Sequence, residues 1–198
     1  ASSGGVLVRR GARAARSAAA RVRVVRSPAQ VSLPSMRFEV THTYPAPPGQ
    51  VGRMLGNDDY LRGSAHASGS VAARHEVAHS EDGSFIVSGT RRLPTDTIPA
   101  SMRSLVGSTI ELKMVQAWSG PDEHDHRTAT VSIDITGAPA RCTARSRLTG
   151  DGDHAQIEHV GEVEVPIPLV GPAVEQAVVD AVRKALDAEH GVALEHLR

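Results

Sequence analysis

Hydrophobic and polar positions alternate from Met36 onward. In the segment MRFEVTHTY, residues 36, 38, 40, 42 and 44 share one side of an extended chain, and the residues between them share the other. Successive side chains of a strand point to opposite faces of a sheet, so this period of two predicts a half-buried strand over residues 36–44.

Six further runs of the same kind follow at short spacing. They cover residues 70–80, 84–93, 108–118, 128–136, 140–149 and 154–165. Most are separated by turn-forming segments, namely EDG, GPDEHDH, GAP and GDGD. Connections this short join antiparallel neighbours, since a parallel crossover needs about a dozen residues or more. Only the segment 94–108 is too long for a hairpin, and its two prolines predict an irregular flap with room for one helical turn.

Helical patterns occur in two places. Residues 45–49 break the first strand, and residues 50–65 can form two short helices, the second capped at its N-terminus by Asn57 or Asp58. Residues 173–197 have no proline and carry apolar side chains at helical spacing, which predicts an amphipathic helix of about 25 residues. Gly191 is the expected place for a late break or kink.

The predicted order of elements is β-α-α-β6-α. A seven-stranded antiparallel sheet with one polar face must bend its apolar face round another element, and only the terminal helix is long enough to close it. The sequence therefore predicts an α+β fold, in which a curved sheet wraps round the C-terminal helix.

Charge divides the chain into two parts. Of the 22 basic residues, seven arginines lie in residues 1–35, where there is no acid; this leaves 15 basic and 22 acidic residues, about −7, in the remainder. We interpret residues 1–35 as a disordered Arg- and Ala-rich extension, and residues 36–198 as the folded domain. The extension has the composition of an organellar transit peptide; the alternative is an upstream extension, with Met36 as the natural start.

Composition excludes several classes of function. An acidic domain without a basic stripe, with only 3% aromatic residues, argues against nucleic-acid binding. No run approaches the roughly 18 apolar residues that cross a bilayer, so integral membrane association is not expected. The single cysteine, Cys142, cannot form an intrachain disulfide, which favours a reducing compartment such as the cytoplasm. No feature indicates an oligomeric state.

Three segments together carry a family resemblance: the opening MRFEVTHTYPAPPGQVGRML, the hairpin that follows Trp118, and the tail VPIPLVGPAVEQAVVDAVRKALDAEHGVALEHL. With the element order, they resemble the START-like, helix-grip superfamily, which includes birch-pollen-allergen-like proteins and polyketide cyclases. The tail looks most like that of an uncharacterised bacterial family. The resemblance covers residues 36–198 and implies a cavity between sheet and helix for a lipid, sterol-like or polyketide-like molecule.

Strand parity selects the residues expected to line that cavity. They are Phe38, Val40, Val71, Ala73, His75, Phe85, Val87, Leu112, Met114, Trp118, Val131, Ile133 and Ile135 from the sheet, with Val174, Val178 and Val182 from the helix. The same alternation also suits a dry core. Small residues such as Ala73, Gly89 and Ala144 favour a pocket, because they leave space between the larger side chains.

Few residues have a pattern typical of chemistry. His75 and His79 lie four apart on a predicted strand, about 13 Å, which is too far to share a metal. His124, Asp125 and His126 share one polar loop that could hold an adventitious cation. No nucleophile, P-loop or dinucleotide motif is present, and Cys142 has no His or Asp motif beside it. The sequence therefore predicts no metal site and no cofactor.

Three classes of function stay open. The first hypothesis is a non-enzymatic protein that binds or carries a small hydrophobic ligand. The second is a cyclase, aromatase or hydrolase on the same scaffold, with His42, His75 or Tyr44 as acid or base, since these residues share the parity of the inner face. The third is a structural or partner-binding module that uses the outer polar face or the N-terminal extension.

Overall fold

The computed structural model describes residues 35–95, 103, 108–167 and 171–198. The predicted extension thus lies outside the described residues apart from Ser35, as does most of the predicted flap. No helix in the described part is long and apolar enough to cross a bilayer.

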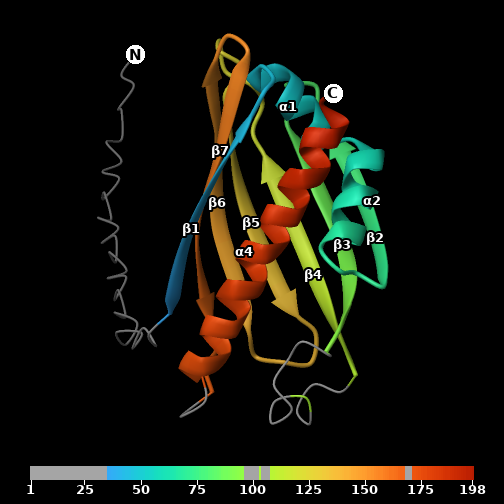
Figure 1. The fold of residues 1–198 in the computed structure, drawn as a ribbon, viewed down its shortest axis with the longest axis vertical. Coiled ribbons are helices and arrows are strands. Elements are labelled where there is room, and N and C mark those ends of the chain that lie inside the picture. The colour runs from blue at the N-terminus through green and yellow to red at the C-terminus, as the bar shows by residue number, and fades with distance from the viewer. Residues whose placement is uncertain (1–34, 96–102, 104–107, 168–170) are drawn as a thin grey trace, which may run out of the picture. The chain divides into compact units, whose positions relative to one another are not determined.

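Seven strands form one antiparallel sheet (Figure 1). Their bounds are β1 Met36–Tyr44, β2 Ala72–His79, β3 Phe85–Pro94, β4 Thr109–Trp118, β5 Arg127–Ile135, β6 Arg141–Asp151 and β7 His154–Glu164. The order across the sheet is β1-β7-β6-β5-β4-β3-β2, so the first strand pairs with the last and the other neighbours follow the chain. The predicted antiparallel hairpins are confirmed, and β1 and β2 form the two edges.

Two short helices connect β1 to β2. Helix α1 spans Pro48–Leu55, with proline in its first turn, and α2 spans Asp58–Ala67. Asn57 caps α2, because its Oδ1 accepts from the backbone N–H groups of Asp59 and Tyr60 at 2.9 and 3.2 Å. This confirms the first of the two predicted caps and fixes where α2 begins beside α4.

The long helix α4, Gly171–His196, lies across one face of the sheet (Figure 1). It packs against β1, β7 and α2. The helix continues through Gly191 with no break, in contrast to the expectation; the site of a Cβ on Gly191 has no neighbour within 4 Å. The glycine therefore lowers helix propensity at an open surface position without ending the helix.

Buried apolar side chains form two separate clusters. The helix-pair cluster lies beneath α1 and α2 and includes Tyr44, Val51, Met54, Tyr60, Leu61, Phe85, Val87, Trp118, Leu148 and Ile157. The second, the β7-end cluster, lies beneath the first half of α4 and includes Phe38, Ala140, Cys142, Val163, Val165 and Val179. In the β7-end cluster the Phe38 ring lies over Gly161, where a Cβ would come within 2.6 Å of Phe38 Cζ.

Candidate functional site

Between the two clusters, inward-facing side chains of the middle strands are only half-buried. We call the region between these strands and α4 the inner gap; half-buried side chains face it from the sheet (Leu112, Met114, Val131, Ile133 and Ile135) and from α4 (Val174, Val178 and Val182), and the two isoleucines and three helix valines pack against the β7-end cluster. Apolar side chains on an inner face that remain accessible are the feature expected of a binding cavity.

The predicted lining residues divide into three groups by burial. Phe38, Phe85, Val87 and Trp118 are fully buried in the two clusters. Val40 and His75 are half-buried, like the residues that bound the inner gap. Val71 differs from the prediction: it is 64% exposed, because β2 begins only at Ala72 and Val71 precedes it. Ala73 is exposed and lies at the rim of a pocket.

That pocket lies between α2 and strands β2–β4. Its walls are Leu61, Ala65, Ala73, Arg74, His75, Val87, Gly89, Thr90, Arg91 and Met114, so four predicted lining residues meet in it. The space open to the centre of a water molecule is about 20 Å³, which is room for about one water. Ligand cavities of about 300–1,000 Å³ are much larger, so a ligand requires the walls to move apart.

An ion pair crosses from the sheet to α4 at the edge of this pocket. Arg91 Nη1 on β3 donates to Glu189 Oε1 on α4 at 2.6 Å and to Ser68 Oγ at 3.1 Å. The two charged side chains are only 12% and 18% exposed. Burying both charges costs desolvation free energy, so this ion pair is weak evidence for a stabilising role. It marks instead a candidate functional site.

Two tyrosines lie near the same carboxylate. Burial raises the pKa of both Tyr44 and Tyr60, and the charge of Glu189 raises them further. Both phenols therefore stay protonated at neutral pH and can donate a hydrogen bond, whereas neither can serve as a base. This removes Tyr44 from the candidate bases and leaves it as a candidate acid.

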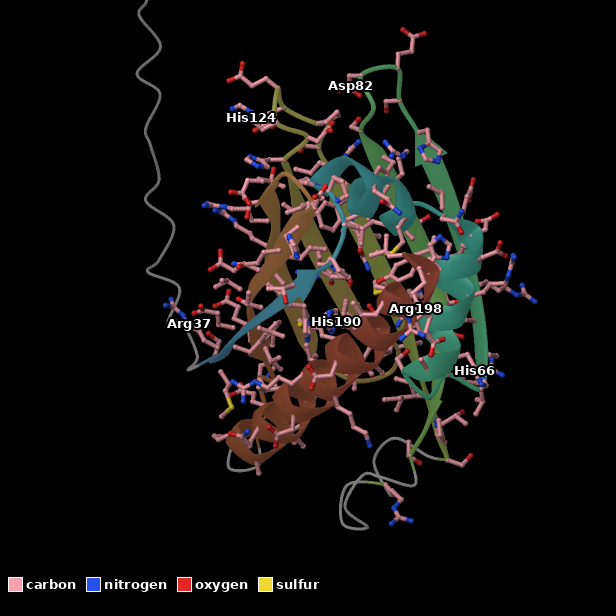
Figure 2. All side chains as sticks on the ribbon, turned by 45° about the horizontal axis from the view of Figure 1, so that its top comes forward. Arg37, His66, Asp82, His124, His190 and Arg198 are labelled. Atoms are coloured by element: carbon pink, nitrogen blue, oxygen red, sulfur yellow. The ribbon has the colours of Figure 1, made fainter. Side chains whose placement is uncertain are left out.

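A group of histidines lies further along α4. His42 Nε2 donates to Asp187 Oδ1 at 2.9 Å, and its ring stacks on His190 with centroids 4.5 Å apart. His190, labelled in Figure 2 on the sheet-facing side of α4, donates to Thr43 O at 2.8 Å. These contacts attach α4 to β1 at the edge of the inner gap.

A third inward histidine was not predicted. His159 Nδ1 is hydrogen-bonded to Ser146 Oγ at 2.8 Å across β7 and β6. Burial, and then the charge of nearby His42, lowers the pKa of His159 to about 4. The ring is therefore neutral at pH 7 and has the polarity to contact a ligand.

The other predicted chemical residues are not brought together. His75, on β2, contacts Asp58 at 3.1 Å at the opposite edge of the sheet from His42 on β1, with five strands, β7, β6, β5, β4 and β3, between them. Burial raises the pKa of the Cys142 thiol to about 11, so it is not a nucleophile at neutral pH. Within the described ranges, no group of three or more His, Cys, Asp or Glu side chains could hold a metal ion.

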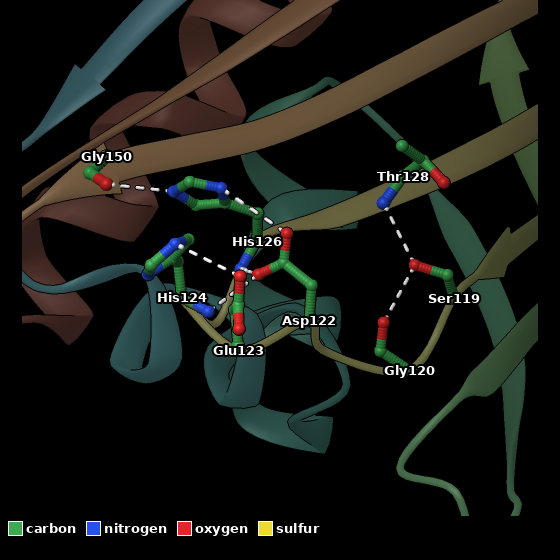
Figure 3. Close-up of polar contacts among 8 residues, drawn as sticks. All are labelled: Ser119, Gly120, Asp122, Glu123, His124, His126, Thr128 and Gly150. Atoms are coloured by element: carbon green, nitrogen blue, oxygen red, sulfur yellow. Dashed lines mark hydrogen bonds and ion pairs between the residues drawn. The ribbon is translucent and has the colours of Figure 1, made fainter.

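The polar loop after β4 has a structural explanation (Figure 3). Asp122 Oδ1 accepts from the backbone N–H groups of His124 and His126, each at 2.9 Å, and these bonds lower the pKa of Asp122. His126 Nε2 donates to Gly150 O at 2.9 Å. The Asp122 carboxylate thus closes the turn, and His126 attaches it to the neighbouring hairpin.

The polar residues that the sequence interpretation missed follow the same parity rule. Arg91 continues the series Phe85, Val87 and Gly89 on β3, and His159 continues Ala155 and Ile157 on β7. On α4, Glu189 lies one helical repeat of seven after Val182. The signal was present, but the predicted lining took only apolar residues from the series on β3 and α4 and none from β7.

Solved structures share this fold at low sequence identity. A START superfamily protein from Mycobacterium smegmatis has a TM-score of 0.53 at 15% identity and covers 82% of this chain and 99% of its own. The Zhui aromatase/cyclase from Streptomyces sp. R1128 has a TM-score of 0.54 at 14% identity, covering 83% and 96%. TTHA0849 from Thermus thermophilus has a TM-score of 0.53 at 14% identity and covers 82% of this chain and 100% of its own.

These similarities confirm the predicted helix-grip fold and the START-like resemblance. At such identities they establish the fold and not an activity. No curated protein matches the chain. A family model does match, over residues 39–197, which is most of the chain. The chain therefore belongs to the family described as protein of unknown function (DUF2505).

Proposed function

We propose that this protein binds a small hydrophobic ligand in the inner gap between α4 and the sheet. The observation that carries the proposal is the half-buried state of Leu112, Met114 and Val131, which face inward yet are less covered than the residues of either cluster. Covering apolar surface releases about 25 cal/mol for each Å² removed from water, so these walls favour an apolar guest.

The closed pocket is too small for such a guest, so binding requires movement. Helix α4 packs on β1, β7 and α2, and the middle strands support the other side of the inner gap. A small displacement of α2 or α4 would therefore enlarge the space without separating any pair of strands. The solved neighbours support the proposal through the fold that they share with this chain.

Two adjacent residues on β4 provide a matched test of the binding face. Met114 faces the inner gap, whereas Val115 is 44% exposed on the outer face. We expect Met114→Gln to weaken binding of the neutral dye N-phenyl-1-naphthylamine at least about fivefold, because burying an unpaired amide costs about 1–3 kcal/mol. Val115→Gln should leave the affinity unchanged. Fluorescence titration measures both.

Equal affinities of the two variants would show that the dye binds elsewhere and would contradict the proposal. Native mass spectrometry of protein from its own host is the complementary measurement. A retained apolar molecule that denaturing conditions release supports binding in the inner gap, and loss of that mass in Met114→Gln but not in Val115→Gln would place it there.

A second candidate function is acid–base catalysis on a bound apolar substrate. Its specific support is His42, whose side chain is 11% exposed and whose Nε2 donates to Asp187. In the neutral ring this leaves Nδ1 as the basic atom, and the carboxylate stabilises the imidazolium that forms when Nδ1 takes a proton. His75 has the weaker case: it contacts Asp58, but among the described residues no second histidine stacks on its ring.

If His42 is a general base, the wild-type protein should hydrolyse p-nitrophenyl octanoate faster than buffer does. We expect His42→Phe to lower kcat about 100-fold or more, the usual contribution of a positioned base, with no change in dye affinity. A rate equal to buffer, or an unchanged rate in His42→Phe, would remove this candidate and leave binding alone.

A further inference from the structure

Arg91 has more hydrogen-bond donors than the described residues use. Its guanidinium carries five N–H donors. Glu189 and Ser68 both bond to Nη1, and Nε and Nη2 have no hydrogen-bond partner within the described part of the chain. Arg91 is also one of the residues that line the small pocket.

Apolar residues make up much of the same pocket. The side chains of Leu61, Ala65, Val87 and Met114 line the pocket, and Gly89 adds no side chain to it. A Cβ on Gly89 would come within 2.2 Å of Arg74 O, so this position is restricted to glycine. Arg91 thus lies beside an apolar wall, in a pocket that Arg74, His75 and Thr90 also line.

We propose that Arg91 anchors the carboxylate of an aliphatic carboxylic acid whose chain lies along the inner gap. This inference rests on the proposed binding function and specifies the ligand class for the same site. The Nε and Nη2 donors form a planar fork that matches the two oxygens of a carboxylate. A hydroxyl group is neutral and has a single oxygen, so it lacks both the charge and the two-oxygen geometry that match this fork.

Glu189 competes with such a ligand for the guanidinium. Its carboxylate already bonds Nη1 at 2.6 Å, so it partly neutralises Arg91 and repels a second anion. A ligand with a single negative charge is tolerated better than a phosphate with two. The pair therefore selects a monoanionic head group and sets the affinity for it below what Arg91 alone would give.

The test compares decanoate with decanol as displacers of bound N-phenyl-1-naphthylamine. Wild type should bind decanoate about tenfold more tightly than decanol. Glu189→Gln should raise the affinity for decanoate about tenfold and change the affinity for decanol less than twofold. Glu195→Gln is the matched control, an exposed acid on the same helix, and should change neither.

Arg91→Met should remove the preference for decanoate, whereas Arg92→Met, on the outer face of the same strand and 55% exposed, should keep it. If Arg91→Met does not fold because Glu189 is left unpaired, the double variant Arg91→Met/Glu189→Met removes both charges and should bind both displacers equally. A preference for decanoate that remains in Arg91→Met, or in the double variant Arg91→Met/Glu189→Met, overturns the inference. If the dye bound neither the wild type nor any of the variants, the proposed function itself would be overturned.

Discussion

Replacing Leu148 by alanine is expected to lower the free energy of unfolding by about 3–5 kcal/mol. Leu148 on β6 is fully buried, and it packs in the helix-pair cluster, where its Cδ2 lies 3.6 Å from the position of a Cβ on Gly52 of α1. Truncation removes its transfer free energy and leaves a cavity that α1 and the sheet can fill only in part. Urea or thermal denaturation measures the loss.

The informative comparison is with Leu112→Ala. Leu112 on β4 is half-buried, so its truncation removes less buried side-chain surface than truncation of Leu148 does. We expect a loss of about 1 kcal/mol or less for Leu112, since little area is re-exposed and no new sealed cavity forms. Equal losses at the two leucines would mean that the inner gap is packed like a core, and the binding proposal would then fail with it.

The strands and the order of elements could be predicted because a sheet covered on one face imposes a strict period of two. The match is close in β1, which has the predicted bounds, and within about two residues elsewhere: residues 70–80 were predicted and β2 covers Ala72–His79. The terminal helix followed from a period of 3.6 and the absence of proline. The ends of the strands were predicted less closely, because residues next to a strand end can continue the alternation without making the hydrogen bonds of the sheet.

The site was predicted less completely than the fold. Parity identifies which face a strand residue occupies, but it does not give where a strand begins, and Val71 is exposed because it precedes β2. Nor does parity give what covers a face, and Phe38 is buried in a cluster. The pairing of Arg91 with Glu189 joins residues 98 positions apart. No local pattern reports such a contact. It arises because α4 crosses the sheet, and its rotation decides which helix residue meets which strand.

A second large effect is expected from acid. His159 is protonated in the unfolded chain below about pH 6.5, whereas burial keeps it neutral in the folded protein until its pKa of about 4. Between these values the unfolded state binds more protons, so stability falls as the pH is lowered. The full contribution is present above pH 6.5, and up to about 3 kcal/mol is lost by pH 4, at 1.36 kcal/mol for each pKa unit.

His159→Asn isolates this contribution, because asparagine keeps a polar partner for Ser146 but does not titrate. We expect the free energy of unfolding of His159→Asn to fall less steeply than that of wild type between pH 6.5 and 4, and the two curves to run parallel above pH 7. His124→Asn is the control: the side chain of His124 is 68% exposed in the loop after β4, so its curve should follow wild type throughout. Parallel curves for wild type and His159→Asn in the acid range would show that His159 is accessible to protons in the folded protein, and that the inner face beside Ser146 is more hydrated than its burial implies.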